Sequence, residues 1–220
     1  MQYDRAGLRS DIEADMAIEI RKIGVIGAGQ MGGGIAHVAA LAGYSVALHD
    51  VSSERIEKGL AAIDGNLARQ ANSGKIAQDD RSAALERIKG APSLEAFAEC
   101  DLVIEAAVED EAVKRKIFAA VCPGLRPEAM LGTNTSSISI TRLASATDRP
   151  ERFIGIHFMN PVPVMQLVEL IRGIATEDET FEAAKAFVAK LGKTIAVSED
   201  FPGFMVNRIL LPMINEAIYT

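Results

Sequence analysis

The strongest constraint on the fold of this chain is a glycine-rich turn between a short apolar run and a helical pattern. The apolar run covers residues 23–26, and the turn GAGQMG at residues 27–32 fits the pattern G-x-G-x-x-G. An alanine-rich helical pattern continues to Leu41, and residues 45–50 predict a second strand that ends in an acid. A strand, a tight turn, a helix and a strand in this order form the unit that binds dinucleotides.

The residues of this turn have separate predicted tasks. Gly27 permits the tight turn, Gly29 lets the backbone approach a pyrophosphate, and Gly32 lets the helix pack closely on the strand. The phosphates would lie at the helix N-terminus, beside Gln30 and Met31, where free amide groups and the helix dipole favour anions. The alternative is a glycine-rich turn that binds no ligand.

The acid at the end of the second predicted strand bears on the choice of dinucleotide. Asp50 lies eighteen residues after Gly32. Its carboxylate can accept hydrogen bonds from ribose hydroxyls, and it would repel a 2′-phosphate. The sequence therefore predicts that NAD is bound in preference to NADP.

The composition limits the class of protein. Of the 220 residues 49% are apolar, which suffices for a packed core, and the formal net charge of −7 argues against a nucleic-acid partner. No apolar run has the length that a membrane-spanning helix requires, so no membrane partner is expected. Cys100 and Cys122 show neither metal nor redox spacing, which favours reduced thiols, a cytoplasmic protein and no metal site.

Short apolar segments alternate with helical patterns along the rest of the chain. This alternation predicts a doubly wound, Rossmann-type α/β fold with a mostly parallel sheet. Helical patterns at residues 53–72 and 78–87 predict a helical hairpin that projects from the fold, because two helices exceed a minimal crossover. Further strands are predicted at residues 88–91, 101–106, 130–134, 152–157, 165–171 and 194–198, with helices at 111–121, 138–146 and 180–191.

The pattern also divides the chain into parts. Residues 1–18 are expected to form an N-terminal appendage in which Met16 is an alternative start, and residues 19–200 the dinucleotide-binding domain. Residues 201–220 are strongly apolar, helical in pattern and without a helix-stop signal at Thr220. They are expected to be the first helix of a larger C-terminal helical domain.

Three polar residues follow or lie on neighbouring predicted strands, where open α/β sheets bind their ligands, namely Ser136, His157 and Glu169. Asn207 opens the helix predicted after the last strand. A histidine suits removal of a hydroxyl proton, so His157 is the candidate base. Glu169 could orient the imidazole and stabilise its charged form. Ser136 and Asn207 could hydrogen-bond the reacting oxygen.

Each of these residues also has a structural interpretation. His157 could be a hydrogen-bonded strand terminus, and Asn207 could be a structural amide. Ser136 or Ser137 could cap the helix predicted from residue 138, which is the better interpretation for one of the two. Glu169 is flanked by apolar neighbours, and a carboxylate buried there needs a partner.

Five segments together resemble the L-3-hydroxyacyl-CoA dehydrogenase family, in particular its short 3-hydroxybutyryl-CoA dehydrogenase type. The segments are GVIGAGQMGGGIA, DLVIEAAVED, TNTSSISIT, HFMNPVPVMQLVELI and DFPGFMVNRIL. The resemblance covers residues 21–220 in order. It implies reversible NAD-dependent oxidation of a (3S)-3-hydroxyacyl-CoA to the 3-oxoacyl-CoA.

The resemblance also implies roles for individual residues. His157 would be the general base and Glu169 its charge partner, with Ser136 and Asn207 completing the site for the substrate oxygen. The remaining implied positions are cofactor contacts at Asp50, Glu109, Lys114 and Asn134, and a substrate-side wall at Asn160. The hairpin at residues 53–89 would dock coenzyme A, with Lys75 as a basic contact, while Asn66 and Ser73 align only loosely with family contacts. Family members dimerise through a C-terminal helical domain, so a homodimer is expected when that domain is complete.

Two other functions remain open at this point. One is another dehydrogenase of 3-hydroxyacids, although such enzymes typically use a lysine base and no lysine stands at position 157. The other is a catalytically silent NAD-binding structural protein on the same fold.

Overall fold

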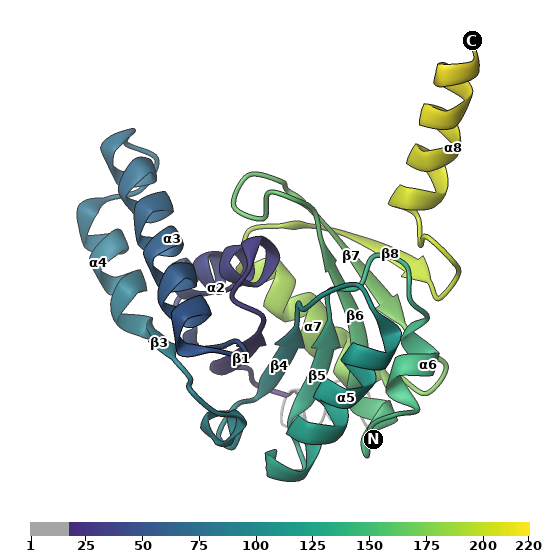
Figure 1. Cartoon of the computed structure of the whole chain (residues 1–220), viewed down its shortest axis with the longest axis horizontal. Helices are drawn as coiled ribbons and strands as arrows, with labels where there is room; N and C mark the ends of the chain where they lie inside the picture. Colours follow the sequence, from purple (N-terminus) through teal and green to yellow (C-terminus); the bar gives the residue numbers. More distant parts are fainter. Residues whose placement is uncertain (1–17) are drawn as a thin grey trace, which may run out of the picture.

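The computed structural model describes residues 18–220, in which eight strands form one sheet. The predicted appendage and the alternative start at Met16 lie outside the described residues, apart from residue 18. The strand order is β3-β2-β1-β4-β5-β6-β7-β8 (Figure 1). Neighbouring strands are parallel except β6 and β7, which are antiparallel. The predicted doubly wound, mostly parallel sheet is therefore confirmed.

The strands lie close to their predicted positions. Their bounds are β1 Lys22–Ile26, β2 Ser45–His49, β3 Ile88–Gly90, β4 Leu102–Glu105, β5 Met130–Thr133, β6 Phe153–Phe158, β7 Leu167–Arg172 and β8 Thr194–Glu199. The central strands are buried along their whole length, which is expected for parallel strands that are covered on both faces.

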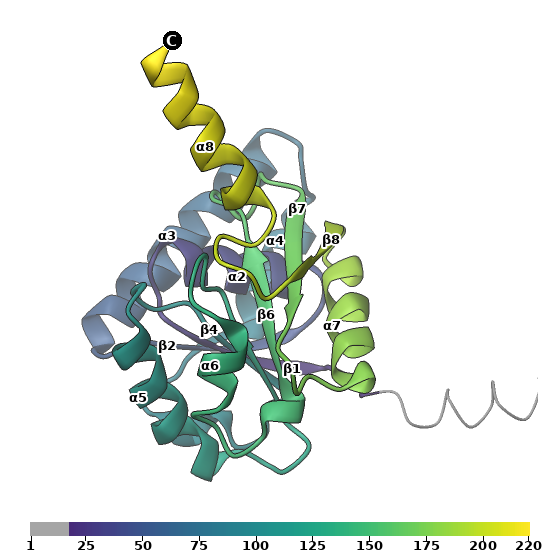
Figure 2. The ribbon, with the colours of Figure 1, turned by 90° about the vertical axis from the view of Figure 1, so that its right-hand side faces the viewer.

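Helices cover both faces of the sheet (Figures 1 and 2). Their bounds are α2 Gln30–Leu41, α3 Ser53–Asn72, α4 Gln78–Arg87, α5 Glu111–Val121, α6 Ile140–Ala144, α7 Asp178–Lys190 and α8 Val206–Tyr219. Side chains of α2 and α7 share one hydrophobic core, and those of α5 and α6 share the other. The two cores hold the sheet between the helix layers. The carboxyl ends of the parallel strands therefore lie together at one end of the sheet, which is called the sheet edge below.

The predicted helical hairpin is present as α3 and α4, which pack beside α2 (Figure 1). Ile56, Ile63 and Leu67 form the buried stripe of α3, and Ser52 caps the helix by accepting a hydrogen bond from the Arg55 amide. The hairpin is therefore held by one apolar face while its other faces remain in contact with solvent.

The predicted helix at residues 138–146 is wrong in extent, because α6 covers only Ile140–Ala144. The expectation that Ser136 or Ser137 caps this helix is also wrong. Ser139 caps it, by accepting a hydrogen bond from the Arg142 amide. The preceding residues form a loop instead, because their polar groups bond to a side chain of another segment.

The last helix, α8, extends away from the sheet (Figures 1 and 2). It carries apolar side chains that are largely exposed, among them Ile209, Leu211 and Ile218. That it begins a separate domain stays a prediction. In the part of the chain from residue 18 onward, no helix combines the length and apolar character needed to cross a bilayer.

Candidate functional site

The glycine turn joins β1 to α2 and leaves the helix N-terminus accessible. Gly27 has a φ of 108°, a left-handed conformation that favours glycine, and its amide donates to the His49 carbonyl at 2.8 Å. Within residues 18–220, Gly29 precedes α2 without a capping side chain, and a β-carbon built there would meet no atom within 4 Å apart from its chain neighbours. This open space beside unpaired amide groups fits a dinucleotide pyrophosphate.

Gly32 is the contact point between helix and turn. A β-carbon at this position would overlap the carbonyl oxygen of Gly27. The variant Gly32→Ala is therefore expected to distort the turn and weaken NADH affinity by at least about tenfold. Fluorescence titration with NADH measures the effect, with Gly65→Ala as the control because a β-carbon there meets only a flexible arginine end. Equal NADH affinity of both variants would contradict this account of the turn.

Asp50 stands at the end of β2, beside the turn. Its carboxylate accepts hydrogen bonds from the amides of Ala28 and Val51, each at 2.8 Å, and lies 3.7 Å from the guanidinium of Arg55. The acid thus braces the turn in addition to its predicted contact with ribose. A carboxylate can accept several hydrogen bonds, so the two tasks are compatible.

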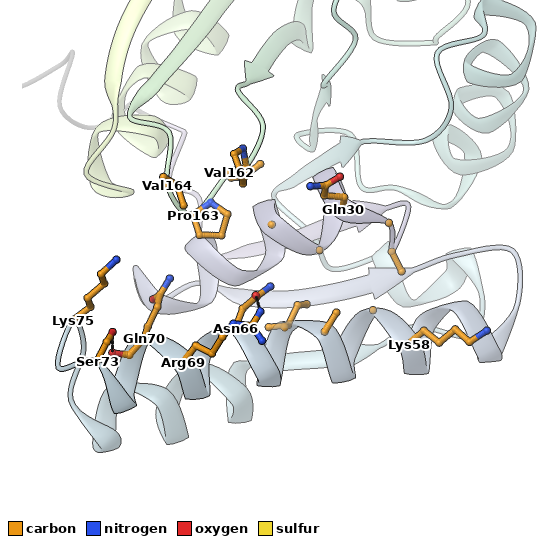
Figure 3. Close-up of a pocket in the computed structure, with 18 residues that line it drawn as sticks. Gln30, Lys58, Asn66, Arg69, Gln70, Ser73, Lys75, Val162, Pro163 and Val164 are labelled. Carbon is orange, nitrogen blue, oxygen red and sulfur yellow. Dashed lines mark hydrogen bonds between the residues drawn. The ribbon is translucent and has the colours of Figure 1, made fainter.

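A groove of about 630 Å³ lies between the helical hairpin and the loop after β6 (Figure 3). Gln30 of the turn and Pro163 and Val164 of the loop lie on the same side of the groove, across from α3 (Figure 3). The α3 side contributes polar and basic side chains, namely Lys58, Asn66, Arg69, Gln70, Ser73 and Lys75. Basic groups beside apolar walls suit an elongated ligand that carries phosphates.

The antiparallel pairing of β6 and β7 places His157 directly opposite Glu169. Nδ1 of His157 lies 2.7 Å from Oε2 of Glu169. The histidine side chain is 9% exposed, whereas that of the glutamate is fully buried. The expected partner of the buried carboxylate is thus the imidazole, and the other ring nitrogen is left for a ligand.

Ser136 and Asn207 also lie together, although they are 71 positions apart. The side-chain amide of Asn207 donates to the Ser136 carbonyl at 3.1 Å, and the Ser136 hydroxyl donates to Glu109 at 3.2 Å. The loop before α6 and the start of α8 are therefore joined at the site.

Glu109 holds the serine loop, defined here as residues 134–139 between β5 and α6, through several hydrogen bonds. One carboxylate oxygen accepts from the hydroxyls of Thr135 and Ser137 and from the amides of Ser136 and Ser137, at 2.6–3.1 Å. Burial alone would raise the pKa of Glu109. The hydrogen bonds from Thr135 and the serines and the charge of Lys114 outweigh it, and they lower the pKa below its ordinary value. The carboxylate is therefore held in its charged form.

Lys114 belongs to a buried ion pair. Its ammonium is 2.7 Å from Glu105 and 3.5 Å from Glu109, and its side chain is 1% exposed. Glu105, which is fully buried, also accepts from the Ala107 amide at 2.6 Å and from the Thr133 hydroxyl at 2.7 Å. These contacts join the ends of β4 and β5 beneath the loop that carries Glu109.

The remaining predicted residues lie at or near the same edge of the sheet. The Asn134 side chain accepts from the Phe158 amide at 2.9 Å, which ties the end of β5 to the end of β6. Asn160 is exposed at the start of the loop that follows β6. Met31 is half-buried and packs against the core beside the turn.

Asp200 makes a structural contact beside the site that the sequence patterns did not indicate. Its carboxylate accepts from the Ser139 hydroxyl and from the amides of Ile140 and Thr141, at 2.8–2.9 Å. It thereby joins the segment after β8 to the start of α6, 60 positions away. Sequence distance conceals such a contact, and no spacing rule would have found it.

These bonds make stability depend on pH. Burial alone would raise the pKa of Asp200, but hydrogen bonds from Thr141, Ile140 and Ser139 outweigh it and lower the pKa. A lowered folded-state pKa stabilises the protein above the unfolded-state value of about 3.9, and this stabilisation is lost as pH falls through the folded-state value. Asp200→Asn is therefore expected to lower the free energy of unfolding at pH 7 by about 1–3 kcal/mol and to approach the parent in acid.

Urea denaturation at several pH values measures this difference. Asp178→Asn serves as the control, since its side chain is 90% exposed. An Asp200→Asn variant whose deficit stays constant down to acid pH would show that the charge of Asp200 is not the cause.

The chain is similar in sequence to 3-hydroxyacyl-CoA dehydrogenases. Residues 22–201 match the family description "3-hydroxyacyl-CoA dehydrogenase, NAD binding domain". A 3-hydroxybutyryl-CoA dehydrogenase of Bradyrhizobium diazoefficiens is 69% identical over 205 residues, which cover 93% of this chain and 70% of that protein. A probable 3-hydroxybutyryl-CoA dehydrogenase of Deinococcus radiodurans is 51% identical over 90% of this chain and 70% of its own length.

The fold is also similar to that of a 3-hydroxybutyryl-CoA dehydrogenase of known structure. The crystal structure of (S)-3-hydroxybutyryl-CoA dehydrogenase PaaH1 from Ralstonia eutropha superposes with a TM-score of 0.89 at 47% identity. The match covers 90% of this chain and 70% of that one.

Proposed function

The chain belongs to the 3-hydroxyacyl-CoA dehydrogenase family, and on this premise we propose that it oxidises short-chain (3S)-3-hydroxyacyl-CoA to 3-oxoacyl-CoA. Relatives named 3-hydroxybutyryl-CoA dehydrogenase support a four-carbon acyl group. The observation that carries the proposal is the 2.7 Å contact between His157 and the buried Glu169, at the sheet edge that also carries the glycine turn.

The proposed cofactor is NAD. When bound, it would accept the hydride that leaves C3 of the substrate. Gly27, Gly29, Gln30, Met31 and Gly32 would hold its pyrophosphate. Asp50 would hold its adenine ribose and disfavour NADP. The other residues proposed to contact NAD are Glu109, Lys114 and Asn134.

The proposed chemistry of the protein is a proton transfer. The free ring nitrogen of His157 removes the proton of the C3 hydroxyl, and in the reverse reaction it returns this proton to the 3-oxo oxygen. Glu169 holds the opposite nitrogen and stabilises the imidazolium that forms. Ser136 and Asn207 hydrogen-bond the C3 oxygen, and Asn160 lines the substrate side.

Spectrophotometry with NADH and acetoacetyl-CoA tests this reaction. We expect NADH to be consumed only when the thioester is present. We also expect the oxidation of NADPH under the same conditions to be much slower. A preference for free acetoacetate would favour a dehydrogenase of free 3-hydroxyacids instead. NADH binding without consumption with either substrate would favour a silent NAD-binding protein.

The groove beside the hairpin is the proposed site for coenzyme A, with Lys75 as a basic contact. Lys75 and Ser73 lie at the end of the groove where the α3–α4 turn faces Val164 (Figure 3). Lys75→Met is expected to raise the KM for acetoacetyl-CoA about two- to fivefold with kcat nearly unchanged, because an exposed ion pair contributes little. Lys89→Met, exposed on β3 and outside this groove, is the control. Equal KM values for the two variants would remove Lys75 from the site.

We also propose that the protein is a cytoplasmic homodimer that binds neither nucleic acid nor membrane. The net charge of −7 supports the absence of a nucleic-acid partner. Burial raises the pKa of the Cys100 thiol to about 11, which suits an unreactive thiol in a reducing compartment. The exposed apolar side chains of α8 support association with a second copy. Light scattering after size-exclusion chromatography measures the assembly.

A further inference from the structure

We propose that the linker, defined here as residues 200–207, positions the imidazole of His157. The ring of Phe204 and the backbone amides of Met205 and Val206 are the groups that do so. This inference rests on the proposed function, in which His157 is the base. It assigns a positioning role to Phe204, Met205 and Val206, which can act without touching substrate or cofactor.

The amides of the linker complete the coordination of the buried carboxylate. Oε1 of Glu169 accepts from the amides of Met205 and Val206, both at 2.9 Å, while Oε2 contacts His157. These amides stand at the start of α8, where a helix leaves its donors unpaired. One carboxylate therefore caps α8 and holds the imidazole, so the position of the helix start determines where Glu169 points.

Phe204 supplies a second contact. Its ring centroid lies 5.8 Å from that of the His157 ring, at an interplanar angle of 62°, and the residue is 3% exposed. Its φ is 48°, a left-handed conformation that is uncommon for a residue with a β-carbon. This backbone turn directs the phenyl ring inward and leaves the next two amides facing Glu169.

The linker is anchored at both of its ends. Asp200 accepts from the start of α6, and the Asn207 side chain donates to the Ser136 carbonyl. The pairing of β6 with β7 sets the distance between His157 and Glu169, but it leaves the rotation of both side chains undetermined. The linker restricts that rotation through one aromatic ring contact and two hydrogen bonds.

The variant Phe204→Leu tests the aromatic contact and keeps the β-carbon and apolar character. Phe187→Leu is the matched control, since Phe187 is equally buried on α7 and packs on Tyr44. Protein labelled with ¹⁵N-histidine gives a readout of ring orientation, because the chain has three histidines and the Nδ1 proton of His157 is held in a short hydrogen bond. We expect Phe204→Leu to shift the His157 signals, to expose the Nδ1 proton to exchange, and to lower kcat about tenfold or more with little change in KM.

The control is expected to leave the His157 signals and kcat near those of the parent, even where it is equally destabilised. A Phe204→Leu protein that matches the control in both readouts would overturn the proposal. If the parent shows no thioester-dependent NADH consumption, the proposed function fails while the histidine signals still decide the positioning.

Semisynthesis tests the amides without altering any side chain. Replacing Val206 by its α-hydroxy acid removes the donor to Glu169, and the same change at Ile209 removes an ordinary bond to the Met205 carbonyl. The Val206 ester should alter the His157 signals, and the Ile209 ester should not. Equal spectra for the two esters would exclude the amides from the positioning of His157.

Discussion

Replacing His157 with glutamine is expected to lower kcat for acetoacetyl-CoA reduction about 10²–10⁴-fold, the range in which a positioned acid–base group contributes. Glutamine keeps hydrogen-bonding capacity near Glu169 but cannot exchange a proton at neutral pH. The KM for the thioester and the affinity for NADH should change little, because the groove and the glycine turn are formed by other residues.

His49→Gln is a matched control for this variant. Its imidazole is also partly buried and hydrogen-bonded, at 2.8 Å to the Ala91 carbonyl, but it lies on β2. Stopped-flow measurement with saturating NADH separates the chemical step from binding. Near-parent turnover of His157→Gln would remove this residue from the mechanism.

Replacing Lys114 with methionine is expected to lower the free energy of unfolding by about 3–5 kcal/mol. Methionine fills much of the same volume but leaves the carboxylate of Glu105 buried without its cation. The remaining bonds from Ala107 and Thr133 do not neutralise that charge. The loop that carries Glu109 should loosen as well, since Lys114 also lies 3.5 Å from that carboxylate.

The double variant Glu105→Leu/Lys114→Met separates charge from packing. Removing both charges leaves no unpaired ion, so this protein should be more stable than Lys114→Met alone. Guanidinium denaturation of the parent, of Glu105→Leu, of Lys114→Met and of the double variant gives the comparison. A double variant that loses the sum of two independent single effects would show that the ion pair is not the source of the destabilisation.

Several expectations from sequence were confirmed because their signals are local. The glycine turn, the run of buried strands and the stripe of α3 each depend on residues a few positions apart. Glu169 illustrates a stronger inference, since a carboxylate flanked by Val168 and Leu170 needs a buried partner, and the structure supplies His157. The same reasoning would have indicated Glu105, which also lies in an apolar strand and pairs with Lys114.

The loop before α6 shows where local signals mislead. A pair of serines ahead of an apolar helical pattern is typical of a helix cap, yet Ser136 and Ser137 bond to Glu109. That carboxylate lies 27 and 28 positions earlier and offers a charged acceptor, which is stronger than a neutral backbone contact. The catalytic and binding roles of the site residues stay predictions that the variants above address.

By itself the sequence determined the alternation of strands and helices, the dinucleotide turn and the identity of the polar residues at the strand ends. These properties follow from backbone preferences and from the cost of burying charge, which act within short segments. Only the tertiary structure decided that Asp200 accepts hydrogen bonds at the start of α6, that Glu109 holds the loop of Ser136 and Ser137, and that Glu169 caps the start of α8. Such bonds join segments 27 to 60 positions apart, and their partners are set by how the sheet edge brings loops together, which no periodicity encodes.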